Sequence, residues 1–186
     1  MRRRELFIFG LTILPLTLRA KIQAVHIAAP GKGFKVSAGE TRSGEHYTMK
    51  GVTANTLDLK ISSSDTGGAL AVFEQIGHTP SGGPPLHIHP NQDEWFHVLE
   101  GKYKFQVGND THRIGQGDTI FLPRNVQHAF VQLSDIGRMI VSYMPAGKME
   151  AFFKATTEWT APPSKEEVDK IFAAHDMQVV GPPLKV

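Results

Sequence analysis

The stretch PPLHIHPNQDEWFHVLEG, residues 84–101, decides the fold. His87 and His89 are two residues apart, so on a β-strand both imidazoles project from the same face. Glu94 follows after a proline and a polar run that can turn the chain and return a carboxylate to the two histidines. We therefore expect one β-hairpin to supply three side chains of the kinds that bind divalent transition metals.

A second stretch, GDTIFLPRNVQHAFVQ at residues 117–132, offers a fourth side chain of this kind. Pro123 and Asn125 predict a turn after an apolar strand. His128 begins the next expected strand, from which its imidazole could complete the site. The histidines outside these two stretches show no comparable spacing, so we interpret them as surface or structural residues.

The rest of the sequence is typical of an all-β protein. Short apolar runs alternate with clusters of Gly, Ser, Asp and Asn, as half-buried strands joined by turns do. The expected strands include Phe34–Val36, Leu57–Ile61, Ala69–Phe73, a hairpin over residues 95–107 that turns at Gly101, Thr111–Ile114 and Thr119–Leu122. Strands at this spacing favour a sandwich or barrel over alternating strands and helices.

The pattern changes near the end of the chain. Apolar residues recur at helical spacing over residues 148–155 and 164–175. Ser164 and Glu167 have the spacing of a capping box, which marks a helix N-terminus. We expect two short helices there, followed by a tail at Gly181–Pro183.

Composition excludes several classes of protein. The 186 residues suit one domain, and the formal net charge of +2, with no Lys/Arg block after the first four residues, gives no reason to expect a nucleic-acid partner. The chain has no cysteine, which excludes disulfides, thiolate metal ligands and cysteine nucleophiles. Any metal must therefore be held by nitrogen and oxygen atoms.

Residues 1–24 have the layout of a secretory signal peptide. An arginine cluster precedes an apolar run from Leu6 to Leu18, and Ala24 could mark the cleavage site. The run is too short and too interrupted for a stable membrane span, and Arg3–Phe7 resembles a twin-arginine export signal. The mature protein would then be periplasmic or secreted. The alternative is that the run is a strand or helix of a cytoplasmic protein.

The first histidine stretch resembles the first motif of the cupin family. That motif is a glycine, five residues, His-x-His, three or four residues, a glutamate, six residues and a glycine. His87, His89, Glu94 and Gly101 match it with the four-residue spacing. Ser81 stands where the leading glycine is expected.

The second histidine stretch resembles the second cupin motif. Gly117, Pro123 and His128 match that motif in register. Asn125 stands in place of a glycine, and Gln132 in place of the final asparagine. Asparagine tolerates the left-handed backbone that such a glycine serves, so Asn125 is a mild departure.

The resemblance implies an all-β cupin barrel, that is, a double-stranded β-helix or jelly roll, over residues 25–147, with a C-terminal helical extension and tail over residues 148–186. It also implies a homodimer, and one metal held by His87, His89, Glu94 and His128. Four protein ligands leave one or two open positions in five- or six-coordinate geometry. Iron, manganese, nickel, copper or cobalt would suit such a site. Zinc suits it less, because a four-ligand tetrahedral zinc is closed.

Strand parity predicts a pocket beside this metal. If Glu94 faces the barrel interior then Phe96 does too, and His128 brings Phe130 and Gln132 inward. The side chains expected to face outward are Trp95, His97 and Leu99. The inward side chains either pack in the core or form a substrate pocket, for which Phe96, Phe130 and Gln132 are the candidates.

The C-terminal sequence YMPAGKMEAFF, with TAPPSKEEVDKIFAAHDMQVVGPPL after it, resembles the tail of bacterial single-domain cupins grouped with quercetin 2,3-dioxygenase. This resemblance implies a metal-dependent dioxygenase that uses dioxygen on a hydroxylated aromatic or flavonol-like small molecule. Glu94 would be both a ligand and the general base that takes the proton of the substrate hydroxyl. Two alternatives remain open: a non-catalytic module that binds a small ligand or the metal, and a metal-dependent isomerase or lyase, which the apolar pocket disfavours.

Overall fold

The computed structural model describes residues 31–50, 55–80 and 82–186. The expected signal peptide at residues 1–24, and the alternative strand or helix in the same place, lie outside the described residues. Within the described ranges, no helix is both long and apolar enough to cross a membrane.

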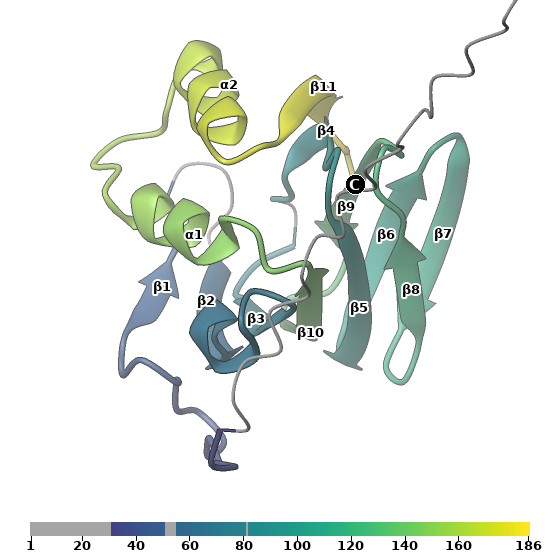
Figure 1. Ribbon diagram of the computed structural model, residues 1–186. Helices are drawn as coiled ribbons and strands as arrows, with labels where there is room; N and C mark the ends of the chain where they lie inside the picture. Colours follow the sequence, from purple (N-terminus) through teal and green to yellow (C-terminus); the bar gives the residue numbers. More distant parts are fainter. Residues whose placement is uncertain (1–30, 51–54, 81) are drawn as a thin grey trace, which may run out of the picture.

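The described chain is mostly β-structure, in two antiparallel sheets (Figure 1). The first sheet contains, in spatial order, β1 (His46–Thr48), β2 (Asn55–Ile61), β3 (Ala71–Gly77), β10 (Gly137–Met144), β5 (Asp93–Glu100) and β8 (Thr119–Leu122). The second contains β11 (Gln178–Pro183), β4 (Pro85–Ile88), β9 (His128–Gln132), β6 (Lys102–Val107) and β7 (Asp110–Gly115). This arrangement confirms the all-β barrel.

Alternation along β5 places one set of side chains in the barrel interior. Glu94, Phe96 and Val98 are buried, whereas Trp95 and its outward neighbours are half-buried. The strand parity expected from the sequence is therefore confirmed. Aromatic and aliphatic side chains from both sheets fill the interior, among them Phe73, Phe96, Tyr103, Phe105, Phe130 and Val141.

The hairpin expected over residues 95–107 does not form, because β5 and β6 lie in different sheets. The link between β4 and β5 corrects a second expectation from the sequence. These strands do not form a hairpin: β4 pairs with β9 and β11 in one sheet, and β5 pairs with β10 and β8 in the other. Pro90 follows β4 and has no amide hydrogen, so it cannot donate to a continued ladder. The chain instead crosses between the sheets, which puts His87 and Glu94 on opposite walls of the barrel.

The strand expected at Phe34–Val36 is also wrong, because these residues are irregular and belong to neither sheet. Phe34 is 47% exposed, and the Arg42 guanidinium lies 4.4 Å from the centre of its ring. Such a cation–π contact covers the ring without a partner strand.

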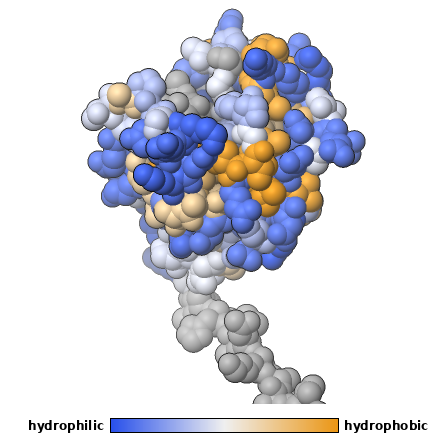
Figure 2. Space-filling model, turned by 90° about the horizontal axis from the view of Figure 1, so that it is seen from above, coloured by the Kyte–Doolittle hydropathy of each residue, from blue (hydrophilic) through white to orange (hydrophobic). Residues whose placement is uncertain are grey.

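The C-terminal segment covers one end of the barrel. It contains α1 (Met149–Thr157), α2 (Lys165–Ala174) and β11, and α1 lies over β1 while β11 runs beside β4 (Figure 1). The expected capping box is confirmed, since the Glu167 amide donates to Ser164 Oγ and the Ser164 amide donates to the Glu167 carboxylate. Seen from this side, apolar surface runs through the middle of the face and hydrophilic residues border it (Figure 2).

Asn125 occupies the turn between β8 and β9 with a φ of 62°, in the left-handed region. Its backbone N–H donates to the His89 carbonyl at 3.0 Å, so this turn forms a hydrogen bond between the two histidine stretches. The structure confirms that Asn125 takes the conformation for which the resembling motif uses glycine.

Replacing Asn125 tests this turn. We expect Asn125→Ala to lower the free energy of unfolding by roughly 1 kcal/mol, because alanine is strained in left-handed backbone. Asn125→Gly, the matched control, should be as stable as the wild type or more so. Urea denaturation followed by circular dichroism measures both, and equal stability of the two variants would contradict the strain argument.

Candidate metal centre

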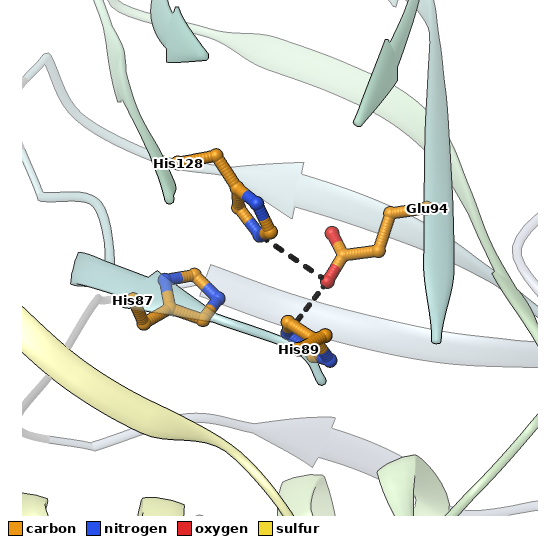
Figure 3. A group of neighbouring side chains, drawn as sticks. All are labelled: His87, His89, Glu94 and His128. Atoms are coloured by element: carbon orange, nitrogen blue, oxygen red, sulfur yellow. Dashed lines mark ion pairs between the residues drawn. The ribbon is translucent and has the colours of Figure 1, made fainter. Parts of the chain in front are cut away.

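His87, His89, Glu94 and His128 converge on one point inside the barrel (Figure 3). Each offers one potential ligand atom, and these atoms all lie within 4.8 Å of one another. All four residues are buried, with exposed fractions between 2% and 6%. The structure thus brings together the four side chains that the sequence singled out.

Both sheets contribute to this cluster, which fixes its geometry. His87 and His128 are directly paired on β4 and β9, with ring centroids 4.5 Å apart. Glu94 projects from β5 in the other sheet, where it pairs with Tyr143 and Leu122. Closing the barrel is therefore what assembles the cluster.

Hydrogen bonds to the outer nitrogens orient the three imidazoles. Nδ1 of His87 donates to the Pro85 carbonyl at 2.8 Å, and Nδ1 of His128 donates to the Val126 carbonyl at 2.9 Å. Since carbonyls only accept, both Nδ1 atoms carry the hydrogen. In a neutral imidazole the lone pair is then on Nε2, which in His128 lies 3.6 Å from Glu94 Oε1.

Gln92 orients the third imidazole. Its Nε2 donates to the Pro145 carbonyl at 2.6 Å, which turns Oε1 toward Nδ1 of His89 at 2.7 Å. His89 therefore donates through Nδ1 as well, and its Nε2 lies 2.7 Å from Glu94 Oε1. Sequence reasoning missed Gln92, although its position between two candidate ligands was a usable signal.

The inner atoms of the cluster lack hydrogen-bond partners within the described part of the chain. These buried atoms are His89 Nε2, His128 Nε2 and Glu94 Oε1. The contacts from Oε1 to the two nitrogens, 2.7 and 3.6 Å long, are ion-pair distances without hydrogen-bond geometry. Buried polar atoms left without partners are costly, so this arrangement calls for a cation at their centre.

The electrostatics of the cluster agree with this interpretation. Burial would raise the pKa of the Glu94 carboxyl, but His89 and His128 outweigh burial and hold that pKa far below its usual value. Burial lowers the pKa of His89, yet the Glu94 carboxylate outweighs it and the net shift is upward. Burial and the neighbouring imidazoles lower the pKa of His87 well below 6.5. A divalent cation would neutralise the Glu94 carboxylate in place of a proton on His89, and it would also be bound by the imidazoles of His87 and His128.

A cavity of about 50 Å³ adjoins the cluster. Phe96 and Phe130 line it, as expected, with their ring centroids 5.7 Å apart. The other side chains around it are mainly aromatic or methionine, and several come from the C-terminal segment: Met149, Phe152, Phe153, Phe172 and Met177. Phe172 packs edge-on against His87 at 5.3 Å, a contact that nothing in the sequence motifs indicated.

Gln132 does not line this cavity, contrary to its expected place in the pocket. It points into the barrel, but its amide donates to the Ser134 carbonyl at 2.8 Å. Gln132 is paired with Tyr103, whereas His128 is paired with Val107, so Gln132 lies four residues further along β9 from the cluster. Strand parity correctly predicted that the Gln132 side chain points inward, but it could not predict how far along the barrel axis Gln132 lies from the cluster.

Gln92 allows a test of the hydrogen bonds around the cluster. We expect Gln92→Leu to weaken binding of divalent cobalt by about 10- to 100-fold, because His89 loses the acceptor that orients it. Calorimetric titration of cobalt into metal-free protein measures the affinity. The exposed Gln116 serves as control, and Gln116→Leu should bind like the wild type. An unchanged affinity in Gln92→Leu would show that His89 is oriented by other means.

Solved structures with the same fold include three that each give a TM-score of 0.52. An RmlC-like cupin from Shewanella frigidimarina is 19% identical, with 63% of this chain and 96% of that chain covered. The polyketide cyclase RemF from Streptomyces resistomycificus is 22% identical, with 62% and 80% covered. Pac13, described as a nucleoside dehydratase, is 13% identical, with 82% and 95% covered. At these identities the likeness concerns the fold alone.

Sequence comparison gives matches that cover a shorter part of the chain. An uncharacterized protein of Streptomyces coelicolor is 32% identical over 54 residues, which are 29% of this chain and 51% of that protein. The match thus spans about half the length of that relative. Residues 78–143, which include all four residues of the cluster, match the family described as the cupin domain. The chain therefore contains a cupin domain match over residues 78–143, within a two-sheet barrel that has the fold of an RmlC-like cupin.

Proposed function

We propose that this protein is a metal-dependent dioxygenase that acts on a hydroxylated aromatic small molecule. The observation that carries the proposal is the convergence of three oriented imidazoles and an ionised carboxylate beside a cavity with aromatic walls. The likeness of the C-terminal sequence to quercetin 2,3-dioxygenase-like cupins supports the same reaction class.

The donor set defines the metal that this proposal requires. Imidazole nitrogen and carboxylate oxygen suit divalent iron, manganese, nickel, copper or cobalt, held by His87, His89, Glu94 and His128. Such an ion supplies Lewis acidity toward a substrate oxygen and, for the redox-active metals, a route for electrons to dioxygen.

Glu94 is the proposed proton acceptor. Both of its histidine contacts fall on Oε1, so Oε2 is the oxygen available to a substrate hydroxyl. The depressed pKa keeps the carboxylate ionised at neutral pH, which an acceptor requires, but it also makes Glu94 a weak base. The substrate hydroxyl must therefore be acidified at the site, as a phenol or enol next to a divalent cation is.

The cavity walls set the size and polarity of the substrate. Phe96 and Phe130 offer aromatic faces to a ring and keep water from the reacting atoms. A cavity of about 50 Å³ is smaller than the roughly 150 Å³ of a cavity that holds benzene. A ring can therefore enter only if side chains of the C-terminal segment, such as Phe152 and Phe172, move aside. This favours a single-ring compound over a three-ring flavonol.

Glu94→Gln tests the proton-acceptor role. We expect the variant to retain metal through its three histidines but to lose oxygen consumption by about 100-fold or more, since the amide cannot take the proton. An oxygen electrode and elemental analysis measure the two quantities with a panel of catechols and flavonols. Glu100→Gln, at the exposed end of the same strand, should behave like the wild type. Unchanged turnover in Glu94→Gln would refute the assignment.

The same assay separates the other functions that a cupin can have. Conversion of a panel compound without oxygen uptake would indicate a lyase or isomerase, the classes to which a dehydratase such as Pac13 and a cyclase such as RemF are closer. Binding without conversion would indicate a ligand-binding module. Either result would contradict the dioxygenase.

The homodimer is part of this proposal. Trp95 and Phe121 are paired on the outer face of β5 and β8, and Phe121 is 54% exposed. Light scattering should give a mass of two chains, and Phe121→Ser should shift it toward one. A mass of one chain for the wild type would contradict the dimer. Export to the periplasm or beyond the cell also stays a proposal.

A further inference from the structure

We propose that Gln75 and Asn55 form a polar subsite at the inner end of the metal cavity. The subsite would hydrogen-bond a carbonyl or hydroxyl oxygen on the side of the substrate ring away from the metal ligands. This inference rests on the proposed function, in that the same cavity must receive a small ring compound.

Both side chains point into the barrel and line the cavity that adjoins the histidine cluster. Gln75 lies on β3 and is 5% exposed, while Asn55 begins β2 and is 6% exposed. Leu57 pairs with Gln75, and Asn55 pairs with Gly77, so the two amides lie on adjacent strands at positions offset by two residues. They are polar groups in a wall that is otherwise mainly apolar.

The side-chain nitrogen of Gln75 makes no hydrogen bond within the described part of the protein. Its Nε2 is fully buried and without a hydrogen-bond partner. The other two buried glutamines of the barrel differ, because Gln92 donates to Pro145 and Gln132 donates to Ser134. A buried amide nitrogen without an acceptor is destabilising, and a ligand that supplies the acceptor would explain its presence in the core.

Strand register places the subsite four residues along the barrel from the cluster. On β10, Tyr143 pairs with Glu94 and Met139 pairs with Gln75. These positions are four residues apart, about 13 Å along the strand. Phe96 pairs with Val141, midway between them. Because Glu94, Phe96 and Gln75 line the same cavity, a substituted ring beside Phe96 can place one oxygen at the cluster and another at Gln75.

This geometry predicts selectivity for a ring that carries a hydrogen-bond acceptor. An acceptor opposite the metal-binding oxygens satisfies the Gln75 amide, whereas an apolar substituent of the same size leaves it without a partner. A site with a committed polar group discriminates against such an analogue. One hydrogen bond corresponds to a preference of roughly tenfold.

Two catechols of nearly equal size provide the probes. 3,4-Dihydroxyacetophenone has a carbonyl oxygen where 4-ethylcatechol has a methylene group. We titrate each into nickel-loaded wild type and into nickel-loaded Gln75→Leu by calorimetry. For each protein we take the ratio of the dissociation constant of 4-ethylcatechol to that of 3,4-dihydroxyacetophenone. This ratio should be about ten times larger for the wild type than for Gln75→Leu. Taking this ratio removes the difference in acidity between the two catechols, because both proteins hold the same metal.

A second measurement separates ligand recognition from a structural role. If the amide serves a ligand, Gln75→Leu and the more conservative Gln75→Met should melt at the wild-type temperature or higher without ligand, and should bind the same amount of nickel. A fall of several degrees in both variants would show that the amide supports the fold, and would overturn the proposal.

The possible failures are distinguishable. If both catechols bind the wild type and the preference is the same in Gln75→Leu, the subsite is wrong and the proposed function stands. If neither catechol binds nickel-loaded wild type, the proposed function fails for this compound class and the subsite fails with it.

Discussion

The orientation of three imidazoles is the constraint on which the rest of the site depends. Each Nδ1 donates to a fixed oxygen, on Pro85, Gln92 or Val126, and this turns each Nε2 inward. Nε2 of His89 and of His128 lie near Glu94 Oε1, and all three atoms are buried without hydrogen-bond partners in the described ranges. A negative charge and several lone pairs at one buried point are stable only around positive charge. The four side chains thus form a buried cluster that could hold a cation.

The fold supplies this constraint by crossing from one sheet to the other between His89 and Glu94. A hairpin would have left the three side chains on one wall, beside one another. The crossing instead sets histidines on β4 and β9 against a carboxylate on β5. The C-terminal segment then covers the cavity, with Phe172 against His87. The cluster and the cover over the cavity are therefore formed by different parts of the chain.

Much of this arrangement could be predicted from the sequence, since residue type and strand parity are local properties. The four clustered residues follow from the two motifs that resemble those of cupins. The inward Phe96 and Phe130 and the capped helix at Ser164 follow from residue spacing. The position of a side chain along the barrel axis, and the sheet to which its strand belongs, depend on pairing between strands that are distant in the sequence. For this reason the sequence misplaced Gln132, and it gave no sign that Gln75 on β3 shares the cavity.

The most direct test of the account is the number of divalent ions bound per chain. Elemental analysis and cobalt titration of the wild type should find one, and the double variant His87→Ala/His128→Ala should lose that binding while keeping its β-sheet circular dichroism spectrum. Tight binding that survives in the folded double variant, or a wild type that binds no divalent transition metal, would contradict the central claim.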